Sequence, residues 1–595
     1  MNLRDRTVQA VVGLTVVAVI LRTVSLGSRV AHWDEGRVAY WVLEYGDTGV
    51  LFYRPIVHGP LLKLVNAPLF ELLGATDFAM RLFPALVGAL LPLSALLFRH
   101  RLRDSAVVSL ALLLALNPVL LYYSRFMRND ILVAAFSFLA FACLVRAIDF
   151  DDGRYLIVAA GALALGFGAK ENALAYVFAF VGAAGLLFGH RLVFGYLDGR
   201  SPATVAVQYL RWGYDGLRRH IRSVVASVVT FLLLITYIHA PRGELPSQGL
   251  YYASCTDYDP YFDVATAPTL GEAATNPLLL PRLVWFSVGS TAELYACQWI
   301  TPRTDDPNPL LEFIHEMGLI TLESSTTLAV LALAGFGLAV FRARPPDDLV
   351  SFTFYWGAAS MVGYPFITDI GGASWLVVHI VLPLAVPAAV ALGALCETGI
   401  EATRDGDTAS AALAVALVVV LVGSMAWTGY ATSAVNTTDD DNPLVQYAQP
   451  SNDLRQSLDE MSRLAEDNKA GPDVIVYGQE LSDPTPDAEL DRRPACVDWF
   501  ETLPLAWYFE ADDITVACAP IEGDLSSALE THDPPVVIAH EDDRLGVDNR
   551  VDDRYEDRTV MMRTTDTPFV YYVDAERLDG TEQQPSIQSP AQPRT

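Results

Sequence analysis

Residues 375–395 read WLVVHIVLPLAVPAAVALGAL, a stretch without an acidic residue, a lysine or an arginine. A transmembrane α-helix needs ~20 predominantly apolar residues, and this stretch has that length. The stretch therefore predicts a helix that spans a membrane.

Runs of the same kind recur along the first two thirds of the sequence. We count about eleven of them, each close to the ~20 residues of a spanning helix. They cover residues 8–26, 78–98, 105–123, 130–147, 155–169, 173–189, 223–240, 323–341, 350–367, 375–395 and 409–430. The first run lacks the cleavage site of a signal peptide, so we interpret it as an anchor. The pattern predicts an α-helical polytopic membrane protein.

The composition separates an apolar part from an acidic part. The chain has 595 residues, 52% of them hydrophobic, and a formal net charge of −29. Lysine occurs only at Lys63, Lys170 and Lys469. Acid excess with scarce lysine is typical of proteins from extreme halophiles, and an ordinary acidic domain surface is the alternative. The charge excludes a basic nucleic-acid binder, and the composition excludes collagen-like, coiled-coil, disordered and disulfide-scaffold proteins.

Arginines predict which side of the membrane each loop occupies. They gather before the first run and after the second, sixth and eighth runs, at Arg4, Arg6, Arg99, Arg101, Arg103, Arg191, Arg200, Arg211, Arg218, Arg219, Arg222, Arg342 and Arg344. With eleven helices, all four clusters fall on one side, which the positive-inside rule makes cytoplasmic. We therefore expect a cytoplasmic N-terminus in the cell membrane, and an extracytoplasmic position for loops 27–77 and 241–322 and for the C-terminal part.

A change of pattern after residue 434 predicts a second domain. We expect a membrane domain over 1–434, an extracytoplasmic α/β domain over 435–580 and a disordered Gln/Pro/Ser-rich tail over 581–595. Helical spacing of apolar residues predicts a helix over 452–467. Short apolar runs predict strands at 474–477, 514–517, 535–539 and 569–573. Alternating helix and strand indicates a small α/β layer domain.

Two further features depend on an oxidising, extracytoplasmic location. Cys255 and Cys297 share one expected outer loop, and Cys496 and Cys518 share the outer domain, so each pair is a candidate disulfide. Four free thiols are the alternative, since sequence does not supply the distances. The sequon at Asn436 predicts N-glycosylation just beyond the last spanning run.

The first outer loop carries two adjacent carboxylates, Asp34 and Glu35, in the sequence His32-Trp33-Asp34-Glu35-Gly36. A carboxylate in hydrocarbon costs about 2.5–3.5 kcal/mol on insertion scales, so the pair should lie at the interface or in a wet cavity. There a carboxylate can serve as a general base or bind a metal ion. A solvated loop pair is the alternative.

Other polar groups fall on the same expected side. His58, in a Val-His-Gly-Pro turn, suits a metal ion or a phosphate, or else marks the entry to a helix. Arg125 and Arg128 suit a phosphate because guanidinium presents a planar fork of donors. Asp130 stands where the next helix should begin and could be its cap.

Lys170 and His379 complete this set. Lys170 interrupts two apolar runs at the outer surface, where it would contact a lipid phosphate or simply mark a turn. His379 lies one turn into the tenth run, facing the same cavity or buried in the core. An outer cavity with carboxylates and several cations suits a lipid-linked phosphate substrate.

Together these motifs resemble the GT-C glycosyltransferases. The acidic pair, the His-Gly-Pro turn, Tyr-Ser-Arg-x-x-Arg-x-Asp and the Lys-Glu between helices are similar to protein O-mannosyltransferases, the lipid A aminoarabinose transferase and an archaeal group of flippase-activity-associated proteins of N-glycosylation. The resemblance covers roughly residues 1–400, and two further stretches, Asn442-Pro443-Leu444-Val445 and 503–508, also resemble the archaeal group.

The resemblance implies inverting transfer of a sugar from a polyprenyl- or dolichyl-phosphate donor to a protein or lipid-linked glycan acceptor. It implies that Asp34 is the catalytic base with Glu35 as its neighbour. It also implies that Arg125, Arg128 and Lys170 hold the donor phosphate. His58 and Asp130 match positions that line the site and that bind a divalent metal in some relatives. The departure is at 371–375, where a basic residue is expected before Trp375 and none occurs.

Two other functions compete with this one. A non-catalytic accessory protein that binds or helps to move lipid-linked sugars would keep the cations but tolerate loss of Asp34. A multi-helix transporter would place ionisable residues at mid-membrane depth and break helices in matching halves. Few charges fall inside the runs, which disfavours the transporter.

Overall fold

The apolar runs of the sequence fold into helices in the computed structural model of the chain. The structure describes residues 5–53, 59–170, 173–243, 262, 266–299, 310–341, 347–366, 373–483, 496–564 and 566–582. His58, Cys255, Arg4, Arg342, Arg344, residues 583–595 and much of the 241–322 loop lie outside this description.

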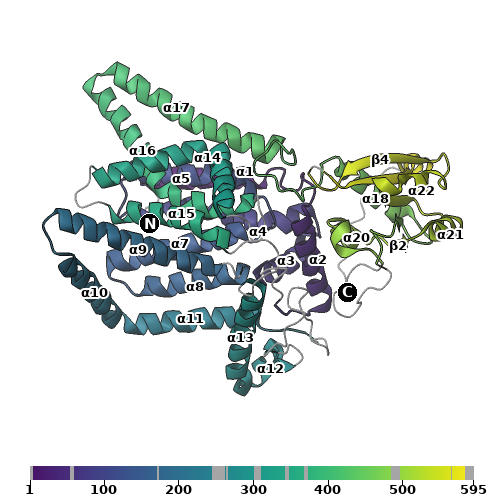
Figure 1. Cartoon of the computed structure of the whole chain (residues 1–595), viewed down its shortest axis with the longest axis horizontal. Helices are drawn as coiled ribbons and strands as arrows, with labels where there is room; N and C mark the ends of the chain where they lie inside the picture. The colour runs from purple at the N-terminus through teal and green to yellow at the C-terminus, as the bar shows by residue number, and fades with distance from the viewer. Residues whose placement is uncertain are drawn as a thin grey trace.

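Within the described residues, eight helices are long and apolar enough to cross a membrane. They are α1 (Arg6–Thr23), α4 (Asp77–Leu90) continued by the 3-10 turn η2 (Leu91–Phe98), α7 (Asp130–Phe150), α9 (Leu174–Leu197), α11 (Ile221–His239), α14 (Leu310–Phe341), η7 (Ser374–Val377) with α16 (Val378–Asp405), and α17 (Thr408–Tyr430) with η8 (Ala431–Val435). They lie side by side in Figure 1. The multi-pass helical fold that the sequence predicts is therefore confirmed.

Three predicted spans take a different form. The run at 105–123 is a bent pair, α5 (Asp104–Leu116) and α6 (Pro118–Ser124), with 50° between the two axes. The run at 155–169 is the shorter apolar helix α8 (Arg154–Ala169), and the run at 350–367 is the 16-residue α15 (Asp348–Gly363). Asn117 separates the bent pair, and its side chain accepts from the Leu120 amide at the start of α6.

A buried arginine completes the break between α5 and α6. Pro118 has no N–H to donate to the Leu114 carbonyl, so the last turn of α5 has unsatisfied acceptors. Arg22 of α1 donates instead to the carbonyls of Leu114 at 3.1 Å and Ala115 at 2.9 Å, and to Ser124 Oγ at 3.1 Å. The arginine thus ties three helices together inside the apolar bundle.

The remaining helices before the sheet surround the bundle. They are α2 (Trp33–Thr48), α3 (Leu61–Leu73), α10 (Pro202–Arg219), α12 (Leu270–Thr275), α13 (Leu280–Trp299) and the 3-10 turns η5 (Pro277–Leu279) and η6 (Tyr364–Phe366). Helices α2 and α3 cover one end of the bundle, and α10 joins α9 to α11 at the opposite end (Figure 1).

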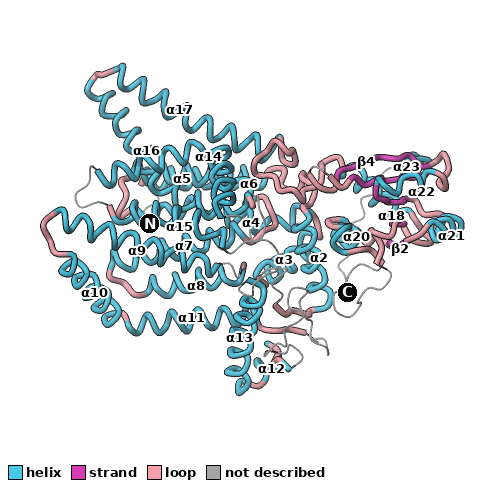
Figure 2. The backbone as a smooth tube through the Cα atoms, viewed as in Figure 1, coloured by secondary structure: helices cyan, strands magenta, loops and turns pink. Residues whose placement is uncertain are grey.

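Every strand of the described residues belongs to one sheet after residue 454, as Figure 2 shows in magenta. Its order is β2-β1-β3-β5-β4, with β1 parallel to β2 and β3, and β5 antiparallel to β3 and β4. The strands are β1 (Val474–Tyr477), β2 (Val516–Ala519), β3 (Val536–His540), β4 (Tyr555–Met561) and β5 (Pro568–Asp574). The helices are α18 (Leu454–Asp467), α19 (Trp499–Thr502), α20 (Leu505–Ala511), α21 (Glu522–His532), η9 (Glu541–Asp543), α22 (Arg544–Asp548) and α23 (Ala575–Glu582). We call residues 454–582 the α/β unit.

The sequence located four of the five strands and the first helix of this unit. It missed β4, because that edge strand exposes most of its side chains and carries three consecutive charged residues, Glu556, Asp557 and Arg558, which protect a sheet edge from further pairing. The predicted Cys496–Cys518 disulfide is present, with 5.7 Å between the two Cα atoms. The described free cysteines are Cys143 and Cys396, and the Cys255–Cys297 pair lies outside the described side chains.

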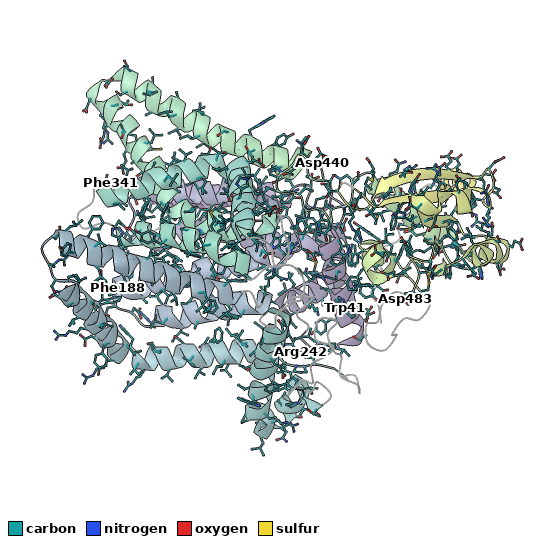
Figure 3. All side chains as sticks on the ribbon, viewed as in Figure 1. Trp41, Phe188, Arg242, Phe341, Asp440 and Asp483 are labelled. Atoms are coloured by element: carbon teal, nitrogen blue, oxygen red, sulfur yellow. A yellow bond between two sulfur atoms is a disulfide. The ribbon has the colours of Figure 1, made fainter. Side chains whose placement is uncertain are left out.

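The α/β unit packs on the end of the bundle where α2 lies. Figure 3 labels Trp41 of α2 near this unit and Phe188 of α9 at the far end. Buried Asp77, the first residue of α4, accepts hydrogen bonds from Trp507 Nε1 at 3.2 Å and from the Tyr508 hydroxyl, and pairs with Arg455. The two parts of the chain therefore share a polar, buried contact.

Arg99 and Arg101, from the arginine cluster predicted after the second run, lie at the other end of the helices. Arg99 pairs with Asp5 at 2.7 Å, which places the N-terminus beside the loop after η2. Arg101 pairs with Asp149 at the end of α7. The arginine-rich end is thus separated from the end that carries Asp34, as the sequence predicts.

Candidate functional site

The acidic pair stands at the first turn of α2. His32 is the N-cap, and its Nδ1 accepts from the Asp34 amide at 3.0 Å. Glu35 reaches back to accept from the His32 amide at 3.0 Å, so the two side chains form a reciprocal cap. Burial lowers the pKa of His32 to about 3, which keeps the ring neutral and its Nδ1 free to accept. This cap fixes the direction of both carboxylates.

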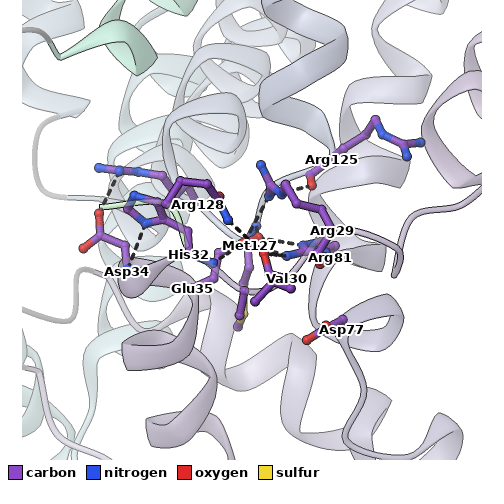
Figure 4. A network of polar contacts seen from close by, with 12 residues as sticks. Arg29, Val30, His32, Asp34, Glu35, Asp77, Arg81, Arg125, Met127 and Arg128 are labelled. Carbon is purple, nitrogen blue, oxygen red and sulfur yellow. Dashed lines mark hydrogen bonds and ion pairs between the residues drawn. The ribbon is translucent and has the colours of Figure 1, made fainter. Parts of the chain in front are cut away.

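Glu35 is fully buried and saturated with donors (Figure 4). Arg81 donates to both of its oxygens, at 2.8 and 2.7 Å, and Arg29 donates at 3.0 Å. The Met127 amide adds a bond of 2.7 Å. Burial opposes ionisation, but the charges of Arg29 and Arg81 outweigh it and lower the pKa of Glu35 to about 2. Glu35 is therefore a fixed anion that joins the start of α2 to α4 and to the segment before α7.

Asp34 points the other way. One of its oxygens contacts Arg37 of the same helix at 2.8 Å, and the other contacts Arg128 at 2.7 Å. Its side chain retains 17% of its exposure, against 0% for Glu35. Of the two adjacent carboxylates, Asp34 is thus the one that solvent or a substrate can reach.

Arg128 links Asp34 to the next carboxylate. Its Nε lies 3.3 Å from Asp130, and it also donates to Gln446, just before the α/β unit. Its guanidinium lies over the ring of Trp375, with 4.1 Å from Cζ to the ring centroid. Stacking on an aromatic face and two carboxylates together hold the guanidinium plane in place.

Asp130 collects the remaining predicted groups. Its Oδ1 lies 3.2 Å from Lys170 Nζ and 3.6 Å from His379 Nε2. His379 in turn contacts the Tyr176 hydroxyl at 2.6 Å through Nδ1 and stacks on Tyr364 with 4.5 Å between ring centroids. We call Asp34, Arg37, Arg128, Asp130 and Lys170 the charged cluster.

Not every predicted residue joins the cluster. Arg125 turns away from it (Figure 4) and donates to the carbonyls of Leu21, Val24 and Ser25 at the end of α1. His58 lies outside the described residues. The adjoining Gly59 is described, and its amide donates to the Ala169 carbonyl at 3.0 Å, directly before Lys170.

Sequence reasoning missed several groups of this site. Arg29 and Arg81 fix Glu35, Arg37 pairs with Asp34, and Trp375 supports Arg128. Arg81 carried a usable signal, because an ionisable residue inside a predicted span is rare and usually paired with another charge. For Trp375, the sequence indicated only that the basic residue expected before it does not occur. In the structure, Arg128 brings a cation to that tryptophan from the segment between α6 and α7.

The surroundings of Asp130 do not fit a divalent cation. Both of its oxygens face positively charged groups, Lys170 and Arg128, which would repel a second cation. Among the described residues, no group of three or more His, Cys, Asp or Glu side chains could hold a metal ion.

The charge balance of the cluster suits an anion instead. Arg37, Arg128 and Lys170 bring three positive charges, and Asp34 and Asp130 bring two negative ones. One positive charge is left over in a site shielded from bulk water. A phosphate, which accepts several charge-assisted hydrogen bonds, complements that excess.

Comparison with known proteins places this geometry in a fold family. A family model described as dolichyl-phosphate-mannose-protein mannosyltransferase matches residues 57–195, and one described as Agl23 flippase-associated protein C-terminal domain matches residues 454–574. The apo crystal structure of ArnT from Cupriavidus metallidurans aligns over 96% of this chain and 99% of that one, with a TM-score of 0.51 and 15% identity. The chain has the GT-C glycosyltransferase fold.

A second ArnT structure supports the same assignment. It is the Cupriavidus metallidurans protein bound to undecaprenyl phosphate, with a TM-score of 0.50, 16% identity and coverage of 96% of this chain and 98% of that one. No curated protein sequence matches the chain. The GT-C resemblance carried by the sequence motifs is therefore confirmed, together with an Agl23-type C-terminal domain.

Proposed function

We propose that the chain is a membrane glycosyltransferase that moves a sugar from a polyprenyl- or dolichyl-phosphate donor to an acceptor hydroxyl. The observation that carries the proposal is the charged cluster. It sets one reachable carboxylate, Asp34, within 2.7 Å of a guanidinium that is itself shared with Asp130. A proton acceptor, Asp34, and a phosphate-binding group, Arg128, are thereby adjacent.

Asp34 takes the role of general base in this proposal. It accepts the proton of the acceptor hydroxyl while the acceptor oxygen forms a bond to the anomeric carbon of the sugar. The bond between that carbon and the phosphate oxygen breaks, and the electron pair leaves with the lipid phosphate. Attack opposite the leaving group inverts the anomeric centre.

Arg128 and Lys170 hold the departing phosphate. Negative charge grows on the phosphate as the sugar leaves, and prearranged cations stabilise that charge in a low-dielectric site. In the structure both cations contact Asp130. In this proposal the oxygens of the donor phosphate replace the Asp130 carboxylate oxygens as acceptors of their N–H groups. Release of Arg128 from Asp34 also leaves Asp34 a better proton acceptor, because a nearby cation disfavours protonation.

The comparisons support this donor class. One family model is described by dolichyl-phosphate-mannose, and ArnT, which shares the fold, has been solved with undecaprenyl phosphate bound. Glu35 and Arg125 have positioning roles in the proposal, since their polar atoms are engaged by backbone and arginine groups. His58 remains a proposed lining residue.

We place the reaction on the extracytoplasmic face. Arg99 and Arg101 lie at the opposite end of the helices from Asp34, and the positive-inside rule assigns arginine-rich loops to the cytoplasm. The acceptor is then a protein or lipid-linked glycan at the cell surface.

Transfer by the Asp34→Asn variant tests the role of the base. The probe is radiolabelled dolichyl-phosphate mannose with purified full-length protein, and the acceptor is a membrane fraction from cells that lack the protein. We expect transfer by Asp34→Asn to fall by about 10²–10⁴-fold, the usual contribution of a general base. Asp47→Asn, at the far end of α2, is the matched control and should transfer at the wild-type rate. Equal rates for Asp34→Asn and wild type would exclude Asp34 as the base.

An accessory role is the second candidate. Its support is the Agl23-type domain, described as flippase-associated, and the engagement of both Asp34 oxygens by arginines. An accessory protein would retain dolichyl-phosphate mannose in a binding assay without transferring the label. Binding that is lost in Arg128→Ala but unchanged in Asp34→Asn, with no transfer by any form, would favour this candidate.

A further inference from the structure

A second cavity lies far from the charged cluster. It has a volume of about 860 Å³ and is lined by residues of α7, α9, α10 and α15. Its α7 residues, Phe141 to Ile148, lie 11 to 18 positions beyond Asp130, which is about 17–27 Å along the helix at ~1.5 Å per residue. On α15 it is lined by the first turns, whereas the last residue of that helix is next to Tyr364 of the cluster side. The cavity thus belongs to the arginine-rich end of the bundle.

The walls of this cavity are apolar and partly aromatic. Phe141 stacks on Phe352 with 5.0 Å between ring centroids, and Phe180 contacts both rings. Leu187 of α9 and Trp212 of α10 line the cavity from the bundle's outer helices. Most of α9 faces outward from the bundle, so the cavity opens where hydrocarbon chains would surround the protein. Such walls suit a hydrocarbon chain.

The rim of the cavity carries an excess of positive charge. Arg101, Arg191 and Arg200 line it together with a single carboxylate, Asp348. Arg191 pairs with Asp348, and Arg101 pairs with Asp149 of α7, so Arg200 carries the remaining positive charge of the rim. Arg200 is about half exposed at 52%, and its nearest carboxylate oxygen, on Asp198, is 3.9 Å away. Arginine prefers to bind phosphate through its planar fork, and Arg200 has little competing for it.

Helix α10 forms one wall of the cavity and has the composition of a helix that lies at the membrane–water interface. It exposes Tyr209 and Trp212 along with Leu210 and Leu217, and carries Arg211 and Arg218 on the same helix. A helix with exposed aromatic and aliphatic side chains and arginines among them lies in the interface between head groups and acyl chains. The rim arginines would then be at the depth of lipid phosphates.

We propose that this cavity binds a lipid phosphate, with the hydrocarbon chain against Phe141, Phe180 and Phe352 and the phosphate on Arg191 and Arg200. The site is separate from the charged cluster and sits at the opposite end of the bundle. It does not depend on the proposed transfer reaction. The shared chemistry, a phosphate on an apolar chain, belongs to anionic phospholipids and to polyprenyl phosphates alike.

Native mass spectrometry of the full-length protein tests the site with three probes: phosphatidylglycerol, undecaprenyl phosphate and zwitterionic phosphatidylcholine. We expect the cavity of wild type to retain one copy of an anionic probe, in addition to any undecaprenyl phosphate held by the charged cluster, and to lose phosphatidylcholine. Arg200→Gln should lower the retained fraction about fivefold, as expected for one arginine at an anionic lipid surface. Ala184→Trp should remove the cavity's copy of either anionic probe by filling the cavity, because Ala184 lines it.

Arg211→Gln is the matched control. It also removes one arginine charge, but Arg211 lies on α10 and does not line the cavity. Its retention should equal that of wild type. Retention of undecaprenyl phosphate alone, or of phosphatidylglycerol alone, supports the site and identifies its source of phosphate. Equal retention of phosphatidylcholine, or an equal loss in Arg200→Gln and Arg211→Gln, overturns the proposal. Circular dichroism of Ala184→Trp separates a filled cavity from a misfolded helix.

Discussion

Gly36 and Pro504 are in direct contact across the junction between α2 and the α/β unit. A Cβ added to Gly36 would lie 2.6 Å from the Pro504 Cβ and 2.9 Å from its Cα. Gly36 stands one residue beyond the acidic pair, so the same short segment carries Asp34 and receives the α/β unit. The position of the C-terminal part and the geometry of the candidate site are therefore set together.

We predict that Gly36→Ala destabilises the protein by about 1–3 kcal/mol, the usual cost of overpacking a buried contact. The reason is that Pro504 backbone atoms would have to move. Thermal unfolding in detergent measures the effect. Gly46→Ala on the same helix is the control, because its Cβ would meet nothing within 4 Å. If both variants unfold at the same temperature, the contact does not constrain the junction.

The pKa of Glu35 predicts a pH dependence of stability. The folded pKa is lowered from 4.5 to about 2, so the carboxylate stabilises the fold fully above pH 4.5. That stabilisation decreases as the pH falls from 4.5 towards 2. The free energy of unfolding of wild type relative to Glu35→Gln should decrease by on the order of 1 kcal/mol between pH 5 and pH 3.5. Denaturant titrations of both proteins at the two pH values measure it, and a pH-independent difference would contradict the ion-pair assignment.

Removal of Arg22 should expose the broken backbone between α5 and α6. Arg22→Met leaves the carbonyls of Leu114 and Ala115 without their buried donor, at a cost of about 1–3 kcal/mol for each unsatisfied group. Arg125→Met is the matched comparison, because Arg125 also donates to three carbonyls but is only half buried. Water can replace Arg125, so its loss should matter less. Melting temperatures that fall equally would argue against a special role for burial.

Loss of Asp77 should loosen the α/β unit. Asp77→Ala leaves Arg455 unpaired and removes the acceptor of Trp507 and Tyr508, for which we expect a loss of about 1–3 kcal/mol. Asp104→Ala is the control, since Asp104 also opens a helix but its ion pair with Arg99 is exposed and worth under ~1 kcal/mol. Limited proteolysis and thermal unfolding together measure the change. Identical protection from protease in both variants would show that Asp77 does not hold the unit.

The sequence predicted the positions of the spans well, because a helix surrounded by lipid must be apolar over its whole length. It did not predict their form. The bend at Asn117 needs Arg22 from a distant helix, and the short α8 and α15 are apolar without being long. These features depend on contacts with residues that are far away in the sequence, so a local sequence pattern does not predict them.

The candidate site follows the same division. Asp34, Arg128, Asp130, Lys170 and His379 meet in the structure, as their common side of the membrane had suggested. The separation of the acidic pair was not predictable, because adjacent residues at a helix start point in directions that only their partners reveal. Arg125 belongs to the same motif as Arg128 and precedes it by three residues, yet its side chain donates to carbonyls at the end of α1.

The segment after α17 has a consequence for protein engineering. Gln446 contacts Arg128, the Leu444 carbonyl accepts from Tyr123, and the Ala448 carbonyl accepts from Trp33, all before the first strand begins. A chimera that exchanged the last third of the chain between two relatives would import foreign neighbours for the membrane helices. Such a graft would work only if the donor's residues at positions 36 and 77, which contact the exchanged part, were transferred with it.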